Sequence, residues 1–161
     1  MKTNLKISNI LSWINLVIGG ILVAGGLLSM LATPNASIIL VSVVLTGSIV
    51  LHSYAALQLR KSIINPDVPL NKQTPIGIRF IGFLALFFAI MNIGNAVVII
   101  QHAKEVLEQV ELPFKPEGMD LVAVIRGVGV FSLLFSLGIA FNVLLNLRLL
   151  KWYQTKDNEA A

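Results

Sequence analysis

The most constraining feature of this sequence is a long segment that carries no charge. No Asp, Glu, Lys or Arg occurs between Lys6 and Arg60. The turn-forming run Thr33-Pro34-Asn35 divides this segment once. Its two apolar halves, 10–31 and 36–59, are each long enough for a helix that crosses a bilayer, which takes about 20 residues.

Two further stretches, 78–102 and 123–148, have the same length and apolar character. A segment within lipid must be helical, because the hydrocarbon offers no partner for backbone N–H and C=O groups. The sequence therefore predicts an all-α integral membrane protein. We expect an antiparallel four-transmembrane-helix bundle that forms a single domain over residues 1–161.

The composition agrees with this interpretation. Hydrophobic residues make up 56% of the chain and charged residues only 12%, with a mean hydropathy of +0.84. Soluble domains carry about 25% charged residues, so this chain has too few to cover a water-facing surface. Because it has no cysteine, disulfides, thiol chemistry and cysteine-ligated metals are excluded.

Basic residues gather at one side of the predicted spans. They are Lys2, Lys6, Arg60, Lys61, Lys72, Arg79, Arg148, Lys151 and Lys156. Lys and Arg concentrate on the cytoplasmic side of membrane proteins, so both termini are predicted to be cytoplasmic. The layout resembles small four-span proteins of the bacterial inner membrane, and we expect a multi-pass protein of the cell (inner) membrane. The basic face favours contact with anionic lipids; its residues are too scattered for a nucleic-acid site.

An acidic segment follows the third span on the opposite side. Residues 103–112 are predicted to be helical and to extend the span beyond the membrane or bend onto its surface. The segment carries Glu105, Glu108 and Glu111. These carboxylates are a candidate surface for a protein partner; the alternative is an ordinary solvated helix face.

Small and neutral polar residues recur at helical spacing within the spans, where they let helix backbones approach closely. They are Ser8, Ser12, Asn15, Gly19 and Gly26 in the first span, Ser42, Thr46 and Ser53 on one face and Ser48 and His52 on another face of the second, Gly82, Ala85, Ala89, Asn92 and Ala96 in the third, and Gly129, Ser132, Ser136 and Ala140 in the fourth.

Intramembrane polar residues fall into two layers when depth is taken from the helical rise of about 1.5 Å per residue. Asn15, His52 and Asn142 form an inner layer, and Asn92 and Asn95 an outer one. They either hydrogen-bond between helices as packing groups or line a small ligand cavity. The span cores hold no Asp, Glu, Lys or Arg, which argues against proton relays and ion-coupled carriers.

Neither histidine indicates a metal or cofactor. His52 and His102 fall at very different depths, so they cannot be the two axial ligands of one haem. Neither has a carboxylate or second histidine at metal-ligand spacing within its span, and no nucleotide-binding or catalytic motif is present. We therefore expect no cofactor, no metal site and no catalytic residues.

The sequence favours a non-enzymatic membrane subunit or regulator that acts through helix–helix contacts and its acidic outer segment. Its expected partners are membrane lipids and either another protein or a second copy of the chain. The alternative is a binding or transport protein for a lipid or small neutral solute, which would use the intramembrane polar layer. An enzyme ranks third.

Overall fold

The computed structural model describes residues 1–32, 40–109 and 118–160. Within these ranges 90% of the residues are helical and no strand occurs. The elements are α1 (Lys2–Ala32), the π-helical turn η1 (Leu40–Leu45), α3 (Thr46–Ile64), α4 (Thr74–Ile76), the π-helical turn η2 (Gly77–Ile81), α5 (Gly82–Gln101), α6 (Ala103–Gln109) and α7 (Leu121–Ala160). The all-helical prediction is confirmed.

Three helical segments are long and apolar enough to cross a membrane, which indicates a multi-pass membrane protein. They are Lys2–Leu28, Thr74–Gln101 and Leu121–Lys156. The other predicted span, 36–59, begins in residues that lie outside the described ranges. Its remainder forms η1 and the first part of α3.

The distribution of side chains between surface and interior is the reverse of that in a soluble protein. Ile21 is 67% exposed and Leu134 is 64% exposed, whereas Asn142 and Asn146 are fully buried. A large apolar surface of this kind is unfavourable in water. In lipid it costs nothing, and buried polar groups then hold the helices together.

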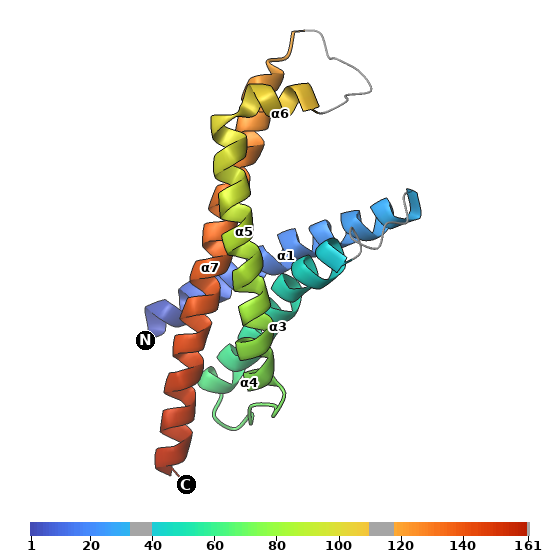
Figure 1. Ribbon diagram of the computed structural model, residues 1–161. Helices are drawn as coiled ribbons and strands as arrows, with labels where there is room; N and C mark the ends of the chain where they lie inside the picture. Colours follow the sequence, from blue (N-terminus) through green and yellow to red (C-terminus); the bar gives the residue numbers. More distant parts are fainter. Residues whose placement is uncertain (33–39, 110–117, 161) are drawn as a thin grey trace.

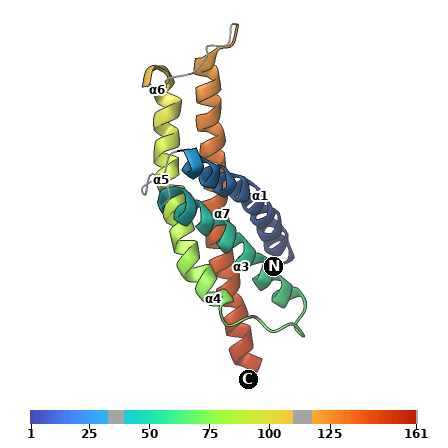
Figure 2. The same ribbon diagram turned by 90° about the vertical axis from the view of Figure 1, so that its right-hand side faces the viewer.

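The helices form two hairpins that cross each other. Figures 1 and 2 show α5 and α7 running side by side over a long distance, while α1 and α3 form a second pair inclined to them. In both views α5 and α7 extend above α1 and α3, α7 also continues below them, and both chain termini lie in the lower half of the molecule. The four helices therefore meet over only part of their length.

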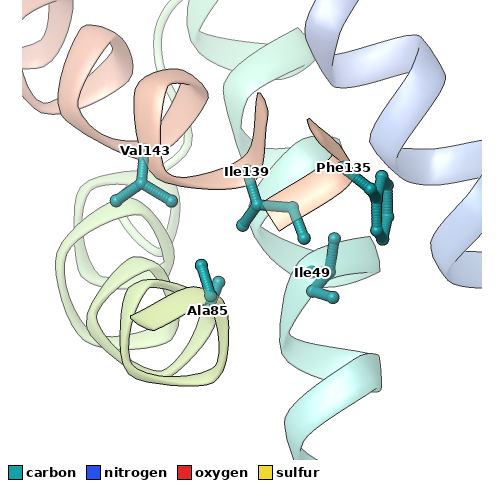
Figure 3. Close-up of a cluster of buried hydrophobic side chains, with 6 residues drawn as sticks. Ile49, Ala85, Phe135, Ile139 and Val143 are labelled. Atoms are coloured by element: carbon teal, nitrogen blue, oxygen red, sulfur yellow. The ribbon is translucent and has the colours of Figure 1, made fainter. Parts of the chain in front are cut away.

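A hydrophobic cluster marks the place where the hairpins cross. Ile49 of α3 lies among Ala85 and Ala89 of α5 and Phe135, Ile139 and Val143 of α7 (Figure 3). Alanine at two successive turns of α5 lets the larger side chains of α7 approach its backbone. Beyond Ala89 and Phe135, α5 and α7 continue as a pair, and we call residues 90–101 and 121–134 the two-helix arm.

Glycine brings α1 and α3 together in the other hairpin. A Cβ atom added at Gly19 would lie 3.1 Å from Val50 Cγ2 and 3.4 Å from Ile49 Cγ2. Any larger side chain at this position would push the helices apart.

Helix α5 ends within one residue of the predicted third span, whereas α7 runs past the predicted end of the fourth. Helix α5 stops at Gln101, and α6 starts again at Ala103 and crosses the end of the arm (Figure 1). The predicted fourth span ends at residue 148, but α7 continues to Ala160. Arg79 Nη2 donates a hydrogen bond of 2.7 Å to Gln154 Oε1, which ties this extension to the base of α5.

Candidate functional site

Four buried polar side chains join α1 to α7, and we call them the polar seam. Ser8 Oγ donates a hydrogen bond of 2.7 Å to Asn146 Oδ1. One turn further along, Ser12 Oγ lies 3.3 Å from both polar atoms of the Asn142 amide. All four residues are buried.

The spacing of the seam follows from helix geometry. Residues four apart lie on the same face of a helix, so Ser8 and Ser12 match Asn142 and Asn146 across the antiparallel pair. Asn146 Nδ2 also donates to Asn142 Oδ1 at 2.9 Å and to its backbone oxygen at 2.7 Å. The seam is thus a connected set of neutral groups that serve as hydrogen-bond donors and acceptors for one another. This arrangement favours the packing interpretation over a ligand cavity.

The predicted inner layer of Asn15, His52 and Asn142 lies close to this seam, but hydrogen bonds do not join His52 to the other two residues. Asn15 is buried on the same face of α1 as Ser12. His52 is 2% exposed and contacts α5, since a Cβ added at Gly82 would lie 2.9 Å from His52 Nδ1 and 3.4 Å from Val143 Cγ1. Within the described residues, no hydrogen bond joins His52 to Asn15 or Asn142, and neither ring nitrogen of His52 has a partner.

The unpartnered ring of His52 leads to a stability prediction. Replacing a buried polar group that has no partner with an apolar one of similar size removes a desolvation cost of about 1–3 kcal/mol. We expect His52→Leu to raise the free energy of unfolding by about 1 kcal/mol, measured by unfolding in detergent. A clear loss of stability in this variant would show that the imidazole has a partner in the membrane.

The two residues of the predicted outer layer have different environments. Asn92 Nδ2 donates to Ser132 Oγ at 3.0 Å and to Ser136 Oγ at 2.7 Å, and so links α5 to α7. Asn95 is exposed on the two-helix arm, and its amide has no hydrogen-bond partner among the described residues. Asn92 therefore holds α5 against α7, while the side chain of Asn95 is free to contact a neighbouring helix.

The acidic segment has a defined start at the end of the arm. The helix breaks at His102, whose Nδ1 lies 3.0 Å from Glu105 Oε2. Glu105 and Glu108 are exposed on α6. Glu111 lies outside the described residues.

The polar seam offers only hydrogen bonds between neutral groups. Within the described ranges, no group of three or more His, Cys, Asp or Glu residues is placed to hold a metal ion. The seam contains serine hydroxyls and asparagine amides, which are poor general acids and bases near neutral pH. Such groups hold helices together or orient a neutral ligand.

Sequence reasoning missed several residues of the polar contacts. Asn146, Ser8 and Ser12 were not among the predicted site residues, although they form the seam with Asn142. The available signal was the four-residue spacing that Ser8 and Ser12 share with Asn142 and Asn146. This spacing becomes informative only when α1 and α7 are known to be neighbours, which the sequence does not show.

Comparison with known proteins does not assign a family. No family model, curated protein or solved structure matches the chain.

Proposed function

We propose that the chain is a four-span protein of the cell membrane with both termini in the cytoplasm. The described part of the additional span, residues 40–59, is about 30 Å long at 1.5 Å per residue, which matches a hydrocarbon core of about 30 Å. It runs antiparallel to α1 (Figure 1). The end of α3, which carries Lys61, and η2, which carries Arg79, lie in the same lower half of the molecule as the termini (Figure 1), as cytoplasmic residues would.

We propose further that it is a non-enzymatic accessory or regulatory subunit that binds another membrane helix along the two-helix arm. The observation that supports this proposal is the exposure of Asn95. It lies six residues before the end of α5, about 9 Å along the helix, and so within the apolar part of the span.

An exposed asparagine amide is unfavourable in lipid. Transfer of an unpaired amide from water into hydrocarbon costs about 4–8 kcal/mol. Asn92, one turn away, avoids this cost through its two serine partners. Asn95 avoids it only when a neighbouring helix supplies a donor or acceptor, which is how polar residues direct association within membranes.

The surroundings of Asn95 suit such a contact. Met91 and Val98 are exposed on the same face of α5, and a Cβ added at Gly94 would meet nothing within 4 Å. A small residue between apolar ones allows a second helix to approach closely. Glu105 and Glu108 are exposed on α6, beyond the end of α5, where they can meet a basic segment of the partner.

Native mass spectrometry of the protein, extracted gently from its own membrane, tests the proposal. We expect a second polypeptide or a defined oligomer with the wild-type chain, and its loss in Asn95→Leu. Val97→Leu is the matched control, because Val97 is exposed at nearly the same depth on the opposite side of α5. This control should retain the complex.

Two outcomes would contradict the subunit proposal. One is a bare monomer for the wild-type chain. The other is a complex that survives Asn95→Leu as well as it survives Val97→Leu.

One observation favours a second candidate, the binding of a lipid or small neutral solute. The buried ring nitrogens of His52 have no partner in the described residues, and a ligand hydroxyl or amide could supply one. A small molecule retained by the wild-type protein and lost from His52→Leu would support this candidate; equal retention would exclude it.

A further inference from the structure

A polar pocket lies between α3 and the loop that leads into α4. Its volume is about 280 Å³, and we call it the loop pocket. None of its lining side chains is charged. They are Tyr54, Ala55, Gln58, Asn71, Gln73 and Thr74.

Hydrogen bonds shape this pocket and leave donors open. Gln58 Nε2 donates to the Tyr54 hydroxyl oxygen at 3.0 Å. Asn71 Oδ1 accepts a hydrogen bond from the backbone N–H of Gln73, and the backbone oxygen of Asn71 accepts one from the N–H of Thr74, both at 2.9 Å, which folds the loop. The Tyr54 hydroxyl hydrogen and the side-chain N–H groups of Asn71 and Gln73 have no partner among the described residues.

Two lysines flank these neutral donors. Lys61 follows Tyr54 and Gln58 at helical spacing and so lies on the same face of α3, toward its end. Lys72 lies in the loop between Asn71 and Gln73. Both lysines are exposed, and no carboxylate lines the pocket. An anion with hydroxyl groups matches this set of cations and neutral donors.

The pocket lies at the level expected for lipid headgroups. A Cβ added at Gly77 would lie 3.5 Å from Ala55 Cβ, which places the pocket beside the base of α5. Arg79, half a turn further on, reaches Gln154 of α7, two residues beyond Trp152. Arginine and tryptophan side chains gather where the hydrocarbon meets the headgroups. Leu51, one turn above Tyr54, is exposed and continues this side of α3 into the apolar region.

We propose that the loop pocket binds the headgroup of an anionic glycerophospholipid. Its phosphate lies beside Lys61 and Lys72, its headgroup hydroxyls bond to Tyr54 and the loop amides, and an acyl chain follows Leu51. This inference rests on the proposed placement of α3 in the bilayer, but not on the partner contact at Asn95.

Competition between lipids tests this inference. The detergent-purified protein is mixed with equal amounts of short-chain phosphatidylglycerol and phosphatidylcholine, and retained lipid is measured by native mass spectrometry. We expect a preference for phosphatidylglycerol. Each lysine near an anionic headgroup changes the affinity for the lipid about fivefold. The double variant Lys61→Gln with Lys72→Gln should therefore bind phosphatidylglycerol about 25-fold more weakly than the wild-type protein does.

A second pair of variants tests the neutral donors. Tyr54→Phe with Gln73→Leu should weaken retention about tenfold, because two hydrogen bonds to the headgroup are lost. The controls are Lys104→Gln, a basic residue at the other end of the molecule, and Asn65→Ala, a residue near the same loop outside the pocket. Both controls should bind as the wild-type protein does.

The inference fails if the pocket variants and the controls retain phosphatidylglycerol equally, since lipid then binds around the whole surface. It also fails if free glycerol phosphate binds as tightly as the lipid, because the ligand would then be a soluble phosphate. Asn95→Leu should keep the lipid preference, so the lipid result and the partner result can be separated.

Discussion

Replacing Gly129 with leucine will open the two-helix arm. A Cβ at this position would lie 2.8 Å from Ile100 Cγ1, 3.0 Å from Ile99 Cγ2 and 3.3 Å from the backbone oxygen of Ala96. Because the last of these is a backbone atom, side-chain rotation alone cannot make room. We expect the free energy of unfolding to fall by about 3 kcal/mol, measured by denaturant titration in detergent.

Gly127 provides the control for this prediction. It lies two residues earlier in α7, and a Cβ added there would meet nothing within 4 Å. Gly127→Leu should leave stability unchanged or raise it by up to about 1 kcal/mol through better helix propensity. If both variants lost stability equally, the α5–α7 contact would not depend on Gly129.

Removing both amides of the polar seam will separate α1 from α7. The double variant Asn142→Leu with Asn146→Leu takes the hydrogen-bond partners from Ser8 and Ser12, which stay buried. Interhelical hydrogen bonds within membranes contribute about 0.6–2 kcal/mol each. We expect the free energy of unfolding to fall by about 2 kcal/mol, measured in the same titration.

The complementary substitutions distinguish hydrogen bonding from packing. Adding Ser8→Ala and Ser12→Ala to the double variant removes the groups that were left unsatisfied, and should restore part of the lost stability. If the quadruple variant were no more stable than the double variant, the loss would come from shape rather than hydrogen bonding. A double variant as stable as the wild type would show that the seam does not hold the hairpins together.

Much of the helical framework could be predicted from where charges are absent. Apolar stretches of about 20 residues can only be helical in lipid, and the described segments agree. Helical spacing also predicted the buried face of α1. Spacing alone grouped Ser8, Ser12, Asn15, Gly19 and Gly26; the first four are buried, and Gly26, near the far end of α1, is half-buried.

The pairing of individual polar residues could not be predicted in the same way. Asn92 and Asn95 have the same chemistry and nearly the same depth, yet only Asn92 faces the serines of α7. Gly127 and Gly129 likewise differ only in which side of α7 meets α5. These differences depend on helix rotation and on the angle between the hairpins, and a single sequence specifies neither.

The length of α7 was also beyond the sequence pattern, whereas a bend after the third span was one of the two alternatives that the sequence predicted. Hydropathy falls at residue 148 because charged residues begin there, but a helix continues in water when side chains support it. The bond from Arg79 to Gln154 is such a support, and it joins residues that are far apart in the chain.

We expect a neighbouring helix to cover the Asn95 face of the two-helix arm in the membrane. The chain has no cysteine, so spin labels can be attached singly at Val98→Cys on this face and at Val97→Cys on the other side of α5. The measurement is the collision rate of each label with oxygen in native membranes and in the purified protein. We predict a low rate for Val98→Cys in native membranes that rises on purification, and a high rate for Val97→Cys throughout. Equal, high collision rates with oxygen at both positions in native membranes would show that no helix covers the Asn95 face.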